Sequence, residues 1–221
     1  MNSFLDRREA GRTLAARLGE YAGRPDVTVL ALPRGGVPVA YEIARALSVP
    51  LDVILVRKVY HPGRHDVPVS TIVSGDFQML DPDVIAARGI DRRDVEREIA
   101  QARHELVDQE RGYRGTRPTT DVAGRTIILV YDGMATGQSM VAAIAAVRAR
   151  GAERVVVAVP VATPNARAIA EQAADTCVCL MTPDPFYRIG VWYDNFAPVS
   201  DASVLVLLDG AARGLRAAAA A

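Results

Sequence analysis

The most informative segment of the chain reads Thr126-Ile127-Ile128-Leu129-Val130-Tyr131-Asp132-Gly133-Met134-Ala135-Thr136-Gly137-Gln138-Ser139-Met140. Its first five residues are β-branched or apolar, which suits a strand that is buried on both faces. Asp132 then places a carboxylate at the end of this strand, and Gly133 and Gly137 permit a tight turn with close backbone approach. An Ala-rich helix is predicted from about Val141. The stretch therefore predicts a buried strand, an acid, a small-residue loop and a helix N-terminus.

Such a loop is suited to binding an anion. Thr136 and Ser139 stand at the predicted helix start, where the first backbone N–H groups have no partner within the helix. Those N–H groups and the helix dipole both favour a phosphate. The alternative for the same residues is an ordinary strand-to-helix turn with an N-cap.

The rest of the chain predicts an α/β fold: a mostly parallel twisted sheet flanked by helices, in a single domain over residues 1–221 with a small C-terminal hood. Strand and helix patterns alternate, and the strands are apolar throughout, as in parallel sheets covered on both faces. We expect strands over residues 26–32, 51–56, 126–130, 155–160 and 176–180, and helices over residues 6–21, 37–47, 91–109 and 165–173.

Composition limits the classes of partner. The 221 residues contain 26 Lys and Arg and 26 Asp and Glu, so the chain has no net charge. This balance argues against nucleic acid or a membrane surface as partner. No apolar run approaches the ~20 residues of a membrane span, and Met1 to Gly11 lacks the apolar core of a secretory signal. Cys177 and Cys179 are interpreted as reduced cysteines of a cytoplasmic protein.

The segment Asp132 to Met140 resembles the phosphoribosyl pyrophosphate (PRPP) motif of type I phosphoribosyltransferases. That motif is a buried strand, two adjacent acids and a small-residue loop with Thr-Gly. Tyr131 departs from it, because it stands where the first acid is usual. The resemblance implies that Asp132 binds the ribose hydroxyls, directly or through Mg²⁺, and that the loop holds the 5′-phosphate. Hypoxanthine-type enzymes carry an Asp just before Thr-Gly, whereas Ala135 occupies that place here, as in adenine-type enzymes.

A second resemblance lies at Pro33-Arg34-Gly35-Gly36, between the first strand and its helix. In the same family this loop holds pyrophosphate and often has a strained, cis-like peptide. Arg57 and Lys58 follow the next strand, and the C-terminal ends of parallel strands share one edge where ligands bind. We therefore expect these cations to converge with Asp132 and to neutralise a pyrophosphate leaving group. The alternative is a plain turn and surface cations.

A third resemblance lies in Pro185 to Asp194, which is similar to the hood of purine-type enzymes; here we expect the hood over residues 182–200. By this resemblance Phe186 and Trp192 stack on the base, and Asp194 contacts its polar edge or its magnesium. An aromatic cluster of this kind is equally consistent with an ordinary core.

Residues 60–76 contain two prolines and two glycines and are expected to form a long mobile loop that closes over the site. Within it we expect an extended segment at Val69 to Val73, with which Phe77 to Leu80 could pair as a hairpin. The whole order of motifs resembles a bacterial phosphoribosyltransferase-like branch with a Pro-Arg-Gly-Gly start and a Trp-Tyr-x-x-Phe ending. The loop of that branch usually reads Gly-His-Pro-Glu-Leu-Ala, whereas this chain has Gly63-Arg64-His65-Asp66-Val67-Pro68.

Two functions follow from these resemblances. The first is an enzyme that binds PRPP with Mg²⁺ and transfers the phosphoribosyl group to or from a nitrogenous base, with pyrophosphate as co-product. The second is a non-catalytic regulator that binds PRPP or a nucleotide. We expect a homodimer in either case. The expected catalytic residues are Asp132, Arg34 and Lys58; the PRPP-binding residues are Arg34, Gly35, Gly36, Arg57, Lys58, Asp132, Gly133, Met134, Ala135, Thr136, Gly137, Gln138 and Ser139; the base-binding residues are Phe186, Trp192 and Asp194; the metal ligands are Asp132 and Asp194.

Overall fold

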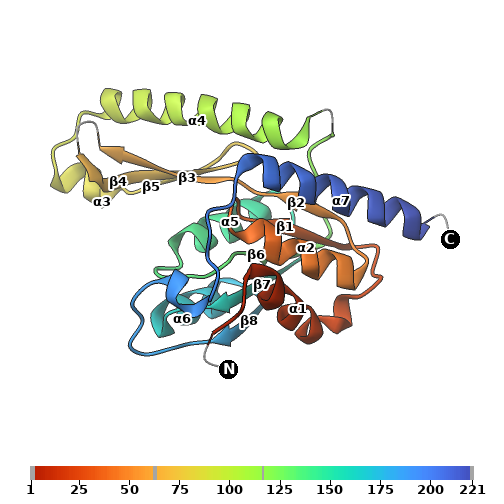
Figure 1. The fold of residues 1–221 in the computed structure, drawn as a ribbon. Helices are drawn as coiled ribbons and strands as arrows, with labels where there is room; N and C mark the ends of the chain where they lie inside the picture. Colours follow the sequence, from red (N-terminus) through yellow and green to blue (C-terminus); the bar gives the residue numbers. More distant parts are fainter. Residues whose placement is uncertain (1–2, 62–63, 116, 220–221) are drawn as a thin grey trace.

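A five-stranded parallel sheet forms the centre of the molecule. The computed structural model describes residues 3–61, 64–115 and 117–219 (Figure 1). The strand order is β2-β1-β6-β7-β8, with every pair of neighbours parallel. The strands are β1 (Val27–Ala31), β2 (Leu51–Val53), β6 (Thr126–Val130), β7 (Arg154–Val161) and β8 (Thr176–Met181). The stretch that predicted a buried strand is β6, in the middle of the sheet, so the α/β prediction is confirmed.

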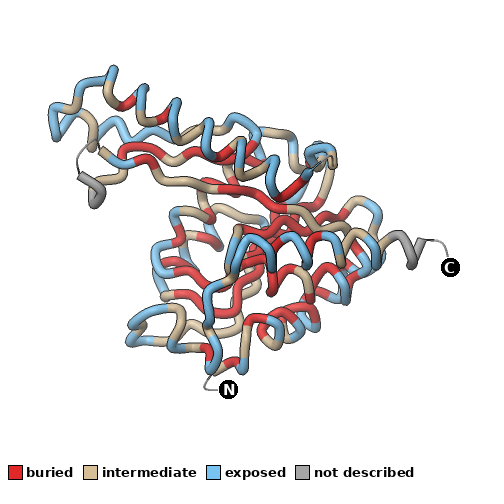
Figure 2. Tube along the Cα trace, turned by 45° about the horizontal axis from the view of Figure 1, so that its top comes forward, coloured by how far each residue is buried: buried red, intermediate tan, exposed pale blue. Residues whose placement is uncertain are grey.

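Helices cover both faces of this sheet. The face toward α1 (Arg7–Arg17), α2 (Gly36–Leu47) and α7 (Asp201–Ala219) receives side chains such as Val29 and Ile128. Alternate residues of the same strands, such as Leu30 and Leu129, pack instead against α5 (Gln138–Ala149) and α6 (Pro164–Ala173). This alternation explains why both strands are apolar at nearly every position, with Thr28 and Thr126 as the exceptions. The buried residues, red in Figure 2, run through the middle of the molecule.

A second, antiparallel sheet projects from the body, and we refer to residues 56–114 as the arm. Helix α4 lies along this sheet in Figure 1. The apolar stripe of α4, including Ile99 and Leu106, packs with Val59, Val69 and Ile72 of the strands. The arm consists of β3 (Val56–His61), β4 (Arg64–Val73), β5 (Phe77–Leu80), α3 (Pro82–Ala87) and α4 (Arg92–Arg114).

Two sequence predictions about this region were wrong in their secondary structure. The expected strand over residues 51–56 is divided, because the chain leaves the parallel sheet after Val53 and enters the arm at Val56. The hairpin expected between residues 69–73 and 77–80 is present as β4–β5, but most of the remaining loop expected over residues 60–76 is strand as well. β4 accommodates Pro68 opposite Tyr60, where the β3–β4 register shifts. Residues 62–63 lie outside the described part of the chain. Whether this hairpin moves over a ligand stays a prediction.

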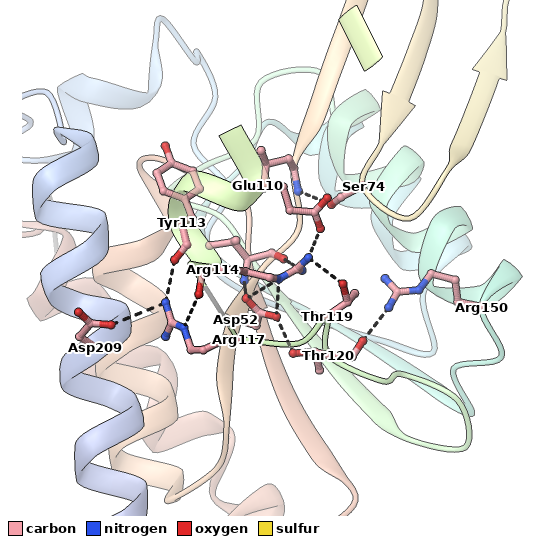
Figure 3. A network of polar contacts seen from close by, with 12 residues as sticks. Asp52, Ser74, Glu110, Tyr113, Arg114, Arg117, Thr119, Thr120, Arg150 and Asp209 are labelled. Atoms are coloured by element: carbon pink, nitrogen blue, oxygen red, sulfur yellow. Dashed lines mark hydrogen bonds and ion pairs between the residues drawn. The ribbon is translucent and has the colours of Figure 1, made fainter. Parts of the chain in front are cut away.

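Arg114, at the end of α4, anchors the arm to the parallel sheet (Figure 3). Its Nε lies 3.1 Å from Asp52 Oδ2 on the edge strand β2, and its Nη2 donates to the carbonyl oxygen of Val53 at 3.1 Å. Nη1 pairs with Glu110 one turn back in α4. Thr120 also donates to Asp52, at 2.5 Å. Because the side chain of Arg114 is only 7% exposed, these contacts form a buried polar network.

The hood is an irregular segment held by the start of the chain. It contains a short 3-10 helix, η2 (Ile189–Trp192), and another, η1 (Gly19–Tyr21), follows α1. Phe4 bridges to Tyr193, with its N–H donating to the carbonyl of Trp192 at 2.9 Å. A separate apolar cluster forms here around Phe4 and Tyr193. Among the described residues, no helix has the length and apolarity to cross a membrane.

Candidate functional site

The C-terminal ends of three parallel strands meet the hood around one cavity of about 1000 Å³. The turn after β1 contributes Gly35, the end of β6 contributes Asp132, and the turn after β7 contributes Thr163. The ends of neighbouring parallel strands form the usual ligand-binding edge of such a sheet. The lining residues are Arg7, Gly35, Tyr131, Asp132, Ala135, Thr163, Phe186, Tyr187, Arg188, Ile189, Gly190 and Phe196.

Asp132 is the acid at the centre of the cavity wall, and it is buried by its neighbours. Its Oδ2 accepts a hydrogen bond of 2.9 Å from Arg7 Nε, and its backbone carbonyl accepts one of 2.6 Å from the hydroxyl of Tyr193. A Cβ atom added at Gly35 would lie 1.9 Å from the same Oδ2. Gly35 is therefore required for steric reasons, since any side chain there would enter the space of the carboxylate.

The electrostatics of Asp132 reflect this burial. Burial raises the pKa of its carboxyl above the ordinary value, and the hydrogen bond and charge of Arg7 limit that rise. Burial also raises the pKa of the neighbouring Tyr131, so its hydroxyl is neutral near pH 7. The cavity wall therefore presents one carboxylate held by one guanidinium beside a neutral phenol.

The loop after Asp132 has backbone N–H groups that are not used in hydrogen bonds to other described residues. Met134 is fixed to the end of β7 by its N–H, which donates to Val161, and by its carbonyl, which accepts from the N–H of Thr163. Gly137 adopts a positive φ of 75° at the start of α5, a conformation that favours glycine. The N–H groups of residues 135–140 donate no hydrogen bond to any described residue. This arrangement supports the predicted anion site at the α5 N-terminus.

The predicted cations only partly converge with Asp132. The Pro33–Arg34 peptide is cis, as the resemblance implied. Arg34 and Arg57 line a neighbouring cavity of about 440 Å³, where Arg34 Nε lies 2.9 Å from Asp201 and Arg57 pairs with Glu105. Lys58 reaches Gln138 at the start of α5, with Nζ 3.3 Å from Oε1. Arg34 and Arg57 thus line a different cavity from Asp132, and Lys58 lies at the N-terminus of α5.

The three predicted base-binding residues are separated. Phe186 lines the large cavity. Trp192 packs in the apolar cluster of the hood with Phe4, and its Nε1 is buried without a hydrogen-bond partner among the described residues. Asp194 is exposed and accepts a hydrogen bond of 2.7 Å from Ser3. Trp192 and Asp194 are not among the cavity-lining residues, because the segment after η2 turns back to pair with residues 4–5.

The donor set does not fit a magnesium ion held by the protein itself. Mg²⁺ prefers oxygen ligands in octahedral geometry and is usually bound through one or two carboxylates plus substrate phosphates. No cluster of three or more His, Cys, Asp or Glu suited to a metal occurs within the described ranges. Oδ2 of Asp132 is already engaged by Arg7, and Asp194 lies outside the cavity.

Sequence reasoning missed several residues of this site. Arg7 and Thr163 line the cavity, but neither belongs to a motif that marked it in advance. Arg188 also lines it and lies within the Pro185–Asp194 motif, but it was not among the expected site residues. Arg7 is the first residue of an amphipathic helix and resembles the many surface arginines of this chain. Tyr193 and Phe196 belong to the Trp-Tyr-x-x-Phe ending, and that pattern was the one available signal for their positions.

Comparison with known proteins agrees with this architecture. Residues 3–185 match the family model described as "Phosphoribosyl transferase domain". A curated protein of Mycobacterium tuberculosis (strain H37Rv), named "Putative phosphoribosyl transferase", is 39% identical over 223 residues. That match covers all of this chain and 49% of the relative, so the chain spans about half the length of the curated relatives it matches.

A solved structure extends the comparison to three dimensions. The crystal structure of the protein TT1426 from Thermus thermophilus is 42% identical, with a TM-score of 0.79. The similarity covers 93% of this chain and 97% of that one. The family match covers most of the chain, and the strand order is that of a parallel sheet flanked by helices. The chain therefore belongs to the phosphoribosyl transferase domain family.

Proposed function

We propose that this protein is a phosphoribosyltransferase that binds PRPP across the strand ends and exchanges pyrophosphate for a nitrogenous base. The 5′-phosphate lies on the open N–H groups at the start of α5, and the ribose lies beside Asp132. The diphosphate extends toward Arg34, Arg57 and Lys58, and the base lies beneath the hood near Phe186. Magnesium enters with the diphosphate as part of the substrate, because the chain lacks a full donor set for it among the described residues.

The observation that carries this proposal is that a carboxylate and a loop with backbone N–H groups that pair with no described residue both follow the same strand, β6. Asp132 and residues 135–140 follow β6 directly, so a single rigid element positions both groups. Positioning and electrostatic stabilisation are the main contributions an enzyme can make to breaking a glycosidic bond with a charged leaving group. The cavity is also large enough for a nucleotide-sized ligand.

Asp132→Asn tests the proposal. We expect PRPP affinity to fall by ~1.5–3 kcal/mol, since the charge-assisted hydrogen bond to the ribose is lost. Titration calorimetry with PRPP and Mg²⁺ gives the measurement, with pyrophosphate release over a panel of bases as the activity assay. Asp83→Asn is the control, because Asp83 is an exposed acid in the first turn of α3. Unchanged PRPP binding by the Asp132 variant would contradict the assignment of this cavity.

A non-catalytic binder of PRPP or a nucleotide is the second candidate. The observation that favours it is the phenol of Tyr131 at the cavity wall, where the family motif has its first acid. With a neutral side chain there and Asp132 held by Arg7, the site carries less free negative charge to stabilise an oxocarbenium-like transition state.

Tyr131→Asp separates the two candidates. If the protein is an enzyme weakened at this position, we expect the substitution to raise PRPP affinity or the rate of pyrophosphate release by about tenfold, as one added charge-assisted hydrogen bond would. Tyr131→Phe is the matched control, because it removes the hydroxyl and keeps the ring. If Tyr131→Asp leaves binding unchanged or weaker while the wild type releases no pyrophosphate, the binder is favoured.

A further inference from the structure

Arg7 belongs to the first helix, yet its side chain forms part of the cavity at the strand ends. Its guanidinium makes three contacts that fix its plane. Nε donates to Asp132 Oδ2 at 2.9 Å, Nη1 donates to the carbonyl of Ala197 at 2.9 Å, and the central carbon lies 3.7 Å from the ring centroid of Phe196. The side chain is only 10% exposed. One residue thus joins α1, the end of β6 and the C-terminal part of the hood.

The remaining nitrogen of this guanidinium is open. Nη2 makes no hydrogen bond or ion pair with any described residue, although the side chain is nine-tenths buried. The buried side-chain nitrogen and oxygen atoms without a partner among the described residues are those of Tyr21 and Trp192, so Nη2 retains contact with open space. Because Arg7 lines the large cavity, that space is the cavity itself.

We propose that Arg7 is a ligand-binding residue that, together with Asp132, recognises the adjacent hydroxyls of a ribose ring. Nη2 supplies a donor and the Asp132 carboxylate supplies an acceptor, which complements a pair of hydroxyls that can each donate and accept. The planar guanidinium of Arg carries several N–H donors in a fixed arrangement, so it can bind a carboxylate and a second group at the same time. The ammonium of Lys is a compact charge on a flexible chain and cannot replace it in this role. This inference rests on the proposed function, because it places a phosphorylated ribose in this cavity.

The charge of Arg7 also bears on metal dependence. A permanent cation already lies against Asp132, so the carboxylate needs no divalent ion to be neutralised. A ribose phosphate without a diphosphate offers little to hold Mg²⁺. Its binding to the wild-type protein is therefore expected to be the same in Mg²⁺ and in EDTA.

The experiment compares ribose 5-phosphate with 2-deoxyribose 5-phosphate by calorimetry, with PRPP and Mg²⁺ as a separate titration. The wild type is expected to prefer the ribose compound by about tenfold, the effect of one charge-assisted hydrogen bond. Arg7→Met keeps an unbranched apolar chain over Phe196 and is expected to lose this preference. Arg7→Lys keeps the charge beside Asp132 and is expected to lose most of it. Arg8→Met is the matched control, because Arg8 is the next residue of α1 and lies over Tyr41 instead.

The outcomes distinguish this inference from the proposed function. If the wild type binds PRPP and both Arg7 variants keep the preference for ribose, the inference is overturned and the proposed function stands. If the wild type binds neither PRPP nor ribose 5-phosphate, the proposed function fails and the inference fails with it. Thermal unfolding of each variant separates lost recognition from lost folding: Arg7→Lys with a wild-type melting temperature and full preference would also overturn the inference.

Discussion

Arg114→Met is expected to lower the free energy of unfolding by about 3–5 kcal/mol, the usual effect of removing one partner from a buried ion pair. The substitution leaves the Asp52 carboxylate, on the edge strand β2, without its cation. It also removes the donors to the carbonyl of Val53 and to the side chain of Glu110 (Figure 3). Urea denaturation followed by circular dichroism gives the measurement.

A matched variant is available one turn earlier in the same helix. The side chain of Arg111 is 77% exposed and lies 3.9 Å from Asp108, an exposed pair of the kind that contributes little. Arg111→Met is therefore expected to change stability by less than about 1 kcal/mol. Equal effects of the two substitutions would show that the network around Arg114 does not stabilise the junction between the arm and the parallel sheet.

Gly35→Ala is expected to abolish detectable PRPP binding and to destabilise the fold by about 1–3 kcal/mol, the range for overpacked interiors. The added methyl group would lie 1.9 Å from Asp132 Oδ2 and 2.5 Å from its Cγ. The carboxylate cannot move aside freely, because it is buried and held by Arg7. Displacement would break that pair and shift the acceptor that the ribose requires. Calorimetry with PRPP and thermal unfolding measure the two effects.

Gly19→Ala is the control for this substitution. Gly19 lies on the surface in η1, and a Cβ there meets no atom within 4 Å. We expect wild-type ligand binding and nearly wild-type stability. If Gly35→Ala bound PRPP like the Gly19 variant, the position of Asp132 could not be critical for ligand binding.

The body of the fold could be predicted from sequence because its signals are local. A run such as Thr126–Val130 is apolar at nearly every position, and only a strand with both faces covered requires that. Of the arm, the hairpin of residues 69–73 with 77–80 could be predicted, but the pairing of β3 with β4 could not. Pro62 and Pro68 suggest a loop, whereas β4 accepts Pro68 at a register shift. The pairing with β3 extends β4 back to Arg64, and such pairing is not visible in a local pattern.

In the candidate site too, residues on a local segment could be predicted and residues placed by long-range contacts could not. Asp132 and the loop that follows it could be proposed as candidates from sequence, because they lie on one continuous segment with a local strand–loop–helix pattern. Arg7 could not be identified, because its role depends on the contact between α1 and the distant end of β6. Asp194 was assigned by its place in a motif, but backbone pairing of the hood with residues 4–5 directs it to the surface. Contacts of this kind join segments that are distant in the sequence, so no local pattern indicates them.

The insertion of the arm between β1 and β6 has a consequence for how the chain folds. These two strands are neighbours in the sheet, yet residues 32–125 separate them in the sequence. Closing so long a segment costs conformational entropy before any strand pairing compensates for it, and pairing distant segments slows folding. The arm consists of hairpins between consecutive strands and of helices α3 and α4, and its two ends meet at β2 through Arg114. An arm that forms early therefore shortens the free chain to be closed, and it delays the central sheet less than an unstructured segment of equal length.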